Sequence, residues 1–257
     1  MPHLERIRSD LKAVEQKHDC RVLFAAESGS RAWGFASPDS DYDVRFIYVK
    51  PSTWYLQLEE RRDTIEWFAD DGLYDYSGWD LSKALRLFAA CNPTLNEQLQ
   101  SPIVYTADET FYRTVLELIP VYFQPKKAMF HYLGIASHSM ETVATQRKME
   151  IKKLFYVLRP LLACLWIAER KAMPPTEFFR LFESVELDFC IRNEIDLLLM
   201  QKHSAKEKEL TEIVPELATW AKQTFEHCDG LAKTFPTAEK PGWEPLNHLF
   251  LKFAWIR

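Results

Sequence analysis

The sequence lacks the features that mark disulfide-rich, zinc-binding and membrane-spanning proteins. Its five cysteines are scattered and include no CxxC pair, so neither a zinc site nor a disulfide framework is predicted. The N-terminal residues have no apolar core of the signal-peptide kind. The most apolar stretch, residues 154–168, is too short to span a bilayer and carries a charge. We therefore expect a protein of the reducing cytoplasm that does not enter the membrane.

An excess of positive charge is also missing. With 32 Lys and Arg against 37 Asp and Glu, the formal net charge is −5, which argues against a protein that wraps nucleic acid, though not against a local basic groove. No GxxxxGK[ST] motif occurs, and no serine–histidine–acid constellation can be assembled. The P-loop and serine-hydrolase classes therefore have no motif to support them.

The pattern of apolar residues predicts an α+β domain followed by an all-helical one. An amphipathic helix is expected through about residue 19, followed by strands at 21–26 and 42–49. Residues 64–68 and 73–77 flank an Asp-Gly pair and predict a hairpin. After about residue 107 helical periodicity takes over. We therefore place one domain at 1–107 and a helical domain at 108–257.

Acidic residues crowd the start of the second expected strand. Asp41 and Asp43 are two residues apart, so on a strand their side chains project to the same side. Like charges this close need neutralisation, and two carboxylates suit Mg²⁺, which prefers oxygen ligands. Two such ions about 4 Å apart would assist both the attack and the departure of oxygens in phosphoryl transfer. Asp39, after Pro38, is interpreted as a turn residue.

A glycine and a serine follow the first expected strand directly. Gly29 lets a phosphate approach the backbone, and exposed amides at a turn bind anions. Ser30 adds a hydroxyl donor and Arg31 a cationic clamp. Glu27 is either a partner that orients Arg31 or a solvated residue. Phosphate-binding groups and metal ligands thus come from adjoining segments, as a nucleoside-triphosphate site requires.

This stretch resembles the GS-x(n)-[DE]-x-[DE] signature of the DNA polymerase β-type nucleotidyltransferase superfamily. The string ESGSRAWGFASPDSDYDVRFIYV, with DYSGWDLSKALRLF and NPTLNEQLQSPIVY, is similar to a narrower branch of predicted nucleotidyltransferases associated with RNA ligases. The resemblance covers about the first 105 residues and extends into KKLFYVLRPLLACLWI. It implies a catalytic first domain and a helical domain that closes the nucleotide and substrate cleft.

The resemblance also implies a third carboxylate from a neighbouring strand. Asp75 is the choice, because it lies in an otherwise apolar strand, where an acid without a partner is rare. Asp80 is the rival, although it also suits the N-cap of the helix that follows. Asp41, Asp43 and Asp75 are therefore the expected catalytic residues and ligands of Mg²⁺ or Mn²⁺.

A second group of candidates lies in the helical half. Lys152, Tyr156 and Arg159 fall at i, i+4 and i+7 and so share one helical face. They could contact the nucleotide, or they could form a solvated basic face with a tyrosine at its rim. The resemblance favours nucleotide binding.

The sequence thus predicts an enzyme that moves a nucleoside monophosphate from a nucleoside triphosphate to an acceptor hydroxyl with release of pyrophosphate. The acceptor stays open among an RNA end, a protein hydroxyl and a small molecule such as an aminoglycoside. The alternative is a sensor that binds a nucleotide or RNA without turnover.

Overall fold

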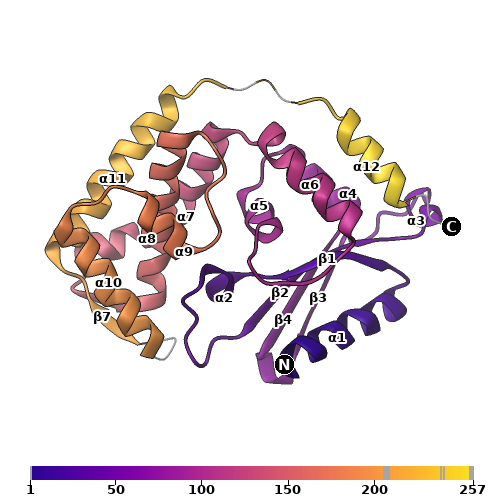
Figure 1. Ribbon diagram of the computed structural model, residues 1–257, viewed down its shortest axis with the longest axis horizontal. Coiled ribbons are helices and arrows are strands. Elements are labelled where there is room, and N and C mark those ends of the chain that lie inside the picture. Colours follow the sequence, from indigo (N-terminus) through magenta and orange to yellow (C-terminus); the bar gives the residue numbers. More distant parts are fainter. Residues whose placement is uncertain (1, 205–208, 238, 240, 255–257) are drawn as a thin grey trace. The chain divides into compact units, whose positions relative to one another are not determined.

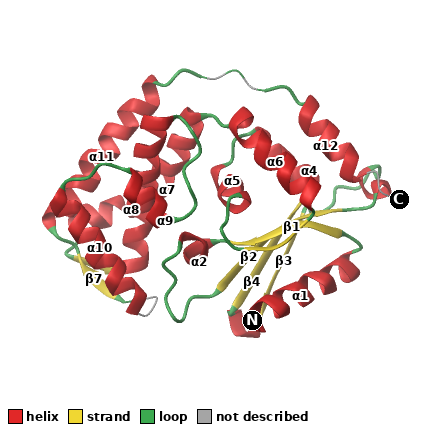
Figure 2. Cartoon of the chain, in the orientation of Figure 1, coloured by secondary structure: helices red, strands yellow, loops and turns green. Residues whose placement is uncertain are grey.

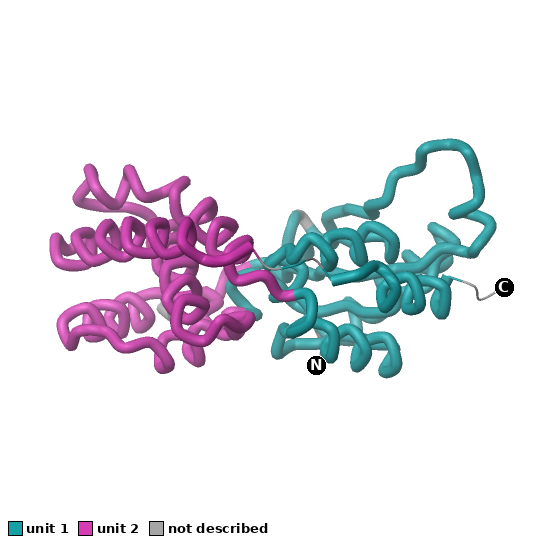
Figure 3. The backbone as a smooth tube through the Cα atoms, turned by 90° about the horizontal axis from the view of Figure 1, so that it is seen from above, with its two compact units in different colours: residues 1–32, 41–122, 239–257 teal, residues 33–40, 123–238 magenta. Residues whose placement is uncertain are grey.

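The computed structural model describes residues 2–204, 209–237, 239 and 241–254. They form two compact units, which Figure 3 shows in different colours. The first unit combines residues 1–32, 41–122 and 239–257, and the second combines 33–40 and 123–238. Each unit is described by itself below.

The boundaries of these units differ from the single division after residue 107 that was expected from the sequence. Residues 33–40 belong to the second unit, where the Phe35 ring lies 4.6 Å from that of Phe155 and 5.4 Å from that of Phe178. The C-terminal residues belong to the first unit, where the Tyr122 hydroxyl donates to the Gly242 carbonyl oxygen at 2.6 Å. Such long-range contacts leave no periodic pattern in the sequence.

A five-stranded mixed sheet is the framework of the first unit, with strand order β3-β4-β2-β1-β5 (Figure 2). Strands β2 and β4 pair in parallel, and the other neighbours pair antiparallel. The expected strands and hairpin are confirmed. Their bounds are β1 Arg21–Glu27, β2 Tyr42–Val49, β3 Thr64–Ala69, β4 Tyr74–Asp80 and β5 Val104–Ala107.

Helices cover both faces of this sheet (Figure 1). Helix α1 (Pro2–His18) packs on one face through Ile7, Leu11 and Val14. The opposite face carries three helices, and α12 packs against the first of them. Their bounds are α4 Leu81–Ala89, α5 Pro93–Leu99, α6 Glu109–Tyr122 and α12 Glu244–Ala254, with short helices α2 Gly29–Trp33, α3 Ser52–Tyr55 and η1 Asp70–Gly72.

Alternation along the strands assigns each side chain to a face. In β2, Val44, Phe46 and Tyr48 are buried on the α1 side. The odd-numbered residues of β2 and β4 therefore point to the opposite face. This places Asp43 and Asp75 on the face away from α1.

The second unit is helical, with one small sheet that the sequence did not indicate. Strands β6 (Lys148–Glu150) and β7 (Leu210–Glu212) pair antiparallel, and three residues are too few for a visible alternation. The helices are α7 Pro125–Thr145, α8 Ile151–Arg170, α9 Phe178–Ser184, α10 Phe189–Ser204 and α11 Pro215–Thr234. None of the helices in the described part of the chain is both long and apolar enough to cross a bilayer.

The packing of β4 on β2 requires a glycine at position 78. Gly78 is the register partner of Phe46, and a Cβ atom on Gly78 would lie 2.2 Å from two ring atoms of Phe46. The Phe46 ring is 2% exposed and held by Trp67, so it has little room to move.

We therefore expect Gly78→Ala to lower the free energy of unfolding by about 1–3 kcal/mol through overpacking. Gly134→Ala is the control, because a Cβ there meets nothing within 4 Å. That change should keep or raise stability by roughly 0.5–1 kcal/mol, since alanine favours the helix. Urea denaturation of both variants checks the prediction, and equal stabilities would contradict it.

Candidate functional site

Two acids of the site lie side by side on neighbouring strands. Asp43 of β2 and Asp75 of β4 are register partners in the parallel pair. Arg45 joins them, because its Nη2 donates to Asp43 Oδ1 at 2.8 Å and to Asp75 Oδ2 at 2.7 Å. Each of the three side chains is between 20 and 24% exposed, so the ion pairs are partly shielded from water. Arg45 therefore offsets one of the two negative charges of this pair.

Arg45 is a site residue that sequence reasoning missed. Its Nη1 also donates to the Asp75 carbonyl oxygen at 3.0 Å, so one guanidinium holds both the side chain and the backbone of Asp75. The signal was present, because a residue two positions after Asp43 shares its face of the strand.

Gly29 is shaped to receive the Asp43 carboxylate. Its φ of +59° is in the left-handed region, and a Cβ atom there would lie 2.2 Å from Asp43 Oδ2. Ser28 ties the two segments together by donating its backbone N–H to the Asp43 carbonyl oxygen at 2.8 Å. The structure thus brings Gly29 and, next to it, Ser30 to the acids.

Arg31 and Asp41 meet through the backbone. Arg31 Nε donates to the Asp41 carbonyl oxygen at 2.9 Å, and the guanidinium lies 3.9 Å from the centre of the Tyr42 ring. Arg31 therefore secures the chain just before β2. The Arg45 ion-pair group contains Asp43 and Asp75 but not Asp41.

Asp80 lies at the opposite face of the sheet from Asp75, because the two are five residues apart on one strand. The expected N-cap is confirmed: Asp80 Oδ1 accepts from the Ser82 N–H at 2.8 Å. Its Oδ2 accepts from the Tyr55 hydroxyl at 2.7 Å, and burial raises the pKa of the carboxyl. Asp75, and not Asp80, is the acid beside Asp43.

Glu27 is buried under the site, so its interpretation as a solvated residue is wrong. It is 1% exposed, and its Oε1 accepts from the Asp43 N–H at 2.6 Å. The Tyr105 hydroxyl donates to its Oε2. Burial raises the pKa of Glu27 to about 7, although the bonds from Tyr105 and Asp43 lower it. The sequence signal was an acid at the end of an apolar strand.

Lys152, Tyr156 and Arg159 lie on α8 of the second unit. Tyr156 is 37% exposed, and its ring meets Trp33 edge-on at 5.3 Å. Arg159 is 2% exposed; its Nη2 donates to the Thr176 carbonyl oxygen at 3.1 Å, and its guanidinium lies 4.8 Å from the Trp33 ring centre. Arg159 thus supports Trp33 from within the core.

The donor chemistry of the site suits a hard divalent cation, since Asp43 and Asp75 present carboxylate oxygens on adjacent strands. In this structure Arg45 forms ion pairs with both Asp43 and Asp75. Among the described residues, no three His, Cys, Asp or Glu side chains are grouped to hold a metal ion. A cation at this site would therefore share the carboxylates with Arg45.

The mixed sheet, its helical layers and the acids beside Gly29 make the first unit an α+β domain with a pair of carboxylates on neighbouring strands. The chain belongs to the RNA repair pathway DNA polymerase beta family, whose family model matches residues 4–252. The resemblance found in the sequence is thereby confirmed.

Two further proteins are similar to this chain. "Uncharacterized protein YcgL" of Bacillus subtilis (strain 168) is 38% identical over 247 residues, which is 96% of this chain and 95% of that protein. The crystal structure of a nucleotidyltransferase-like protein from Exiguobacterium sibiricum 255-15 covers 89% of this chain and 75% of its own at 8% identity. Its TM-score of 0.32 is too low to support an argument.

The raised pKa of Glu27 predicts a pH-dependent stability. A carboxyl whose pKa rises from 4.5 to about 7 on folding contributes stability below pH 4.5, and this contribution is lost as pH rises through 7. Glu27→Gln removes the titration. We compare the free energy of unfolding of the natural protein with that of Glu27→Gln. We expect this difference to shift against the natural protein by up to about 3 kcal/mol as the pH rises from 4.5 to 7.

Denaturant unfolding from pH 4.5 to pH 8 measures this difference. Glu117→Gln is the matched control, because Glu117 is exposed on α6. A Glu27→Gln profile parallel to that of the natural protein would contradict the prediction.

Proposed function

We propose that this chain is a metal-dependent nucleotidyltransferase. The observation that carries the proposal is the pairing of Asp43 with Asp75 across β2 and β4, with Gly29 against the Asp43 carboxylate. An acid pair beside a glycine that admits close approach suits a substrate carrying both phosphate and metal. Family membership supports the same class of chemistry.

In the proposed reaction an acceptor hydroxyl oxygen bonds to the α-phosphorus of a nucleoside triphosphate. The bond from that phosphorus to the oxygen bridging to the β-phosphate breaks, and pyrophosphate leaves with the electron pair. The Asp75 carboxylate accepts the hydroxyl proton, and Gly29 and Ser30 bind the β- and γ-phosphates. Mg²⁺ or Mn²⁺ held by Asp41, Asp43 and Asp75 would supply Lewis-acid stabilisation of the phosphate charge. The chain itself contributes positioning.

Arg45 has the role of a positioning residue in this scheme. By pairing with Asp43 and Asp75 it offsets part of their negative charge and holds both carboxylates in place. Nucleotide contact by Lys152, Tyr156 and Arg159 of the second unit stays a prediction from the sequence. Within that unit Arg159 holds Trp33.

For the acceptor we favour an RNA end. Phe68 of β3 is the register partner of Asp75 and is 72% exposed, which is unusual for a phenylalanine beside an acid pair. Unpaired bases of single-stranded RNA stack on such exposed aromatic rings. The family's description as an RNA repair family agrees with this choice.

The alternative function is a sensor that binds a nucleotide without turnover. The observation in its favour is that Arg45 forms ion pairs with both acids and so offsets part of their charge. Nucleotide binding without any transferred label would favour this alternative.

Transfer should depend on the acid pair. With each of four α-³²P-labelled nucleoside triphosphates, Mg²⁺ or Mn²⁺, and RNA, we expect label on the acceptor with the natural protein. Asp43→Asn and Asp75→Asn should each lower the rate by about 100- to 1000-fold, since each removes a charge from the reacting centre. Asp196→Asn, an exposed acid on α10, is the control and should keep the rate. Equal transfer by all variants would reject the assignment.

The RNA assignment makes a separate prediction for Phe68. Phe68→Ala should raise the KM for a single-stranded RNA acceptor by about 5- to 50-fold, because one stacked base is lost. The KM for the triphosphate should stay unchanged, and Phe68→Trp should retain acceptor binding. Phe189→Ala, on α10, alters an equally exposed ring and is the control. An unchanged KM for RNA in Phe68→Ala would remove the support for stacking while leaving the transferase assignment intact.

A further inference from the structure

The first unit has a second cleft, on the face of the sheet away from the acid pair. It has a volume of about 530 Å³ and lies between the C-terminal half of α1, strand β3 and helix α3. Ile65 and Trp67 line it, and these residues face α1, whereas Phe68 faces the side of Asp75. The cleft is therefore separate from the proposed transferase site.

Two lysines lie at one end of this cleft, Lys17 and Lys50. Arg62 also lines it, but it is ion-paired with Glu66 of the same lining at 2.8 Å. In the described part of the chain, Lys17 has no hydrogen-bond or ion-pair partner. Lys50 Nζ donates to the His18 carbonyl oxygen and forms no ion pair among the described residues. Burial, and then the charges of Lys50 and Lys17, lower the pKa of His18.

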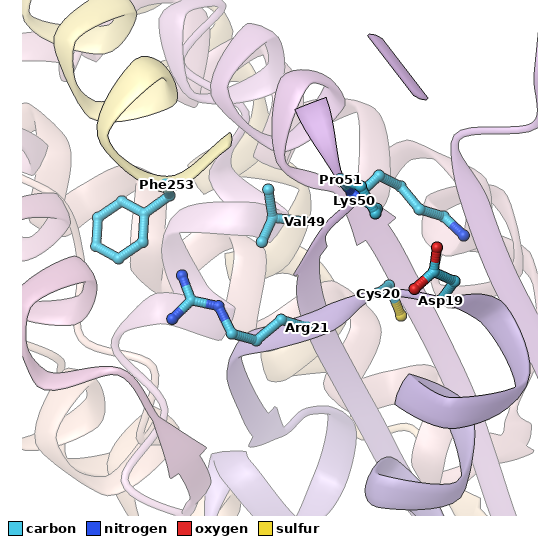
Figure 4. A pocket seen from close by; sticks show the side chains of 7 residues that line it. All are labelled: Asp19, Cys20, Arg21, Val49, Lys50, Pro51 and Phe253. Carbon is cyan, nitrogen blue, oxygen red and sulfur yellow. The ribbon is translucent and has the colours of Figure 1, made fainter. Parts of the chain in front are cut away.

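Lys50 also borders a smaller cavity of about 220 Å³ on its other side, beside Phe253 (Figure 4). Figure 4 shows the Lys50 side chain extending away from Phe253 and toward Asp19. The guanidinium in that cavity, Arg21, lies 5.7 Å from the Phe253 ring centre and 3.6 Å from Asp108. The Lys50 ammonium group is therefore directed toward the C-terminal end of helix α1.

Aromatic rings form another part of the lining. Trp54 of α3 and Trp67 of β3 both border the cleft. Trp67 is held in place by stacking on Tyr76, with ring centres 4.1 Å apart and planes within 5°. A fixed indole beside ammonium groups suits a ligand that has both a flat ring and an anionic group.

We propose that this cleft is a binding site for a nucleoside monophosphate. Lys17 and Lys50 contact the phosphate, and the base lies against Trp54 and Trp67. The volume falls in the range of small-molecule sites. This inference does not depend on the proposed transferase activity.

The test uses the full chain carrying Asp43→Asn, without divalent cations, so that the acid-pair site contributes little. Isothermal titration with AMP, adenosine and inorganic phosphate separates the base from the phosphate. We expect AMP to bind at least about tenfold more tightly than either fragment, because only AMP engages both parts of the cleft. Equal binding by inorganic phosphate, equal binding by adenosine, or no AMP binding would each overturn the proposal.

Variants then place the ligand in the cleft. Lys17→Ala should weaken AMP about five- to tenfold, whereas Lys12→Ala, exposed on the same helix and outside the cleft, should not. Equal AMP binding by Lys17→Ala and Lys12→Ala would overturn the placement of the phosphate.

Discussion

The Arg45 fork between Asp43 and Asp75 is the interaction on which the site depends. Two carboxylates on adjacent parallel strands repel each other, and a half-buried position strengthens that repulsion. One guanidinium bonds to both acids and to the Asp75 backbone. It reduces the repulsion between the carboxylates and holds β2 and β4 in register. Gly29 can then lie directly against Asp43. The acids are thus held in a defined arrangement before any substrate or metal arrives.

Local pattern was enough to predict the sheet and part of the site. Apolar runs predicted the strands that carry Asp43 and Asp75. The Asp-Gly turn predicted that residues 64–68 form a hairpin with the strand of Asp75. The resemblance implied a third carboxylate, and Asp75 was chosen over Asp80 because it lies in an apolar strand whereas Asp80 suits an N-cap. The structure places Asp75 beside Asp43 and Asp80 on the other face. Successive residues of a strand point to opposite faces of the sheet. Once the strand was known, the five positions between Asp75 and Asp80 were enough to place them on opposite faces.

Contacts between distant residues were beyond prediction from the sequence. Glu27 looks like an ordinary acid at a strand end, and only the fold shows that Tyr105, 78 residues away, covers it. The boundaries of the units were hidden for the same reason, because Phe35 packs on α8 through side chains that no local pattern connects. Whether a polar group is buried, and whether it has a hydrogen-bond partner, depends on how the whole core is assembled.

The return of the chain's end to the first unit has a consequence for how this protein is made. Helix α12 covers Phe111 with Phe253 and Tyr55 with Phe250, and it leaves the ribosome after every residue of the second unit. Domains generally fold as units during synthesis, from the N-terminus onward. Here the sheet of the first unit is synthesised well before α12, so nascent chains expose the apolar surface around Phe111 until α12 has emerged.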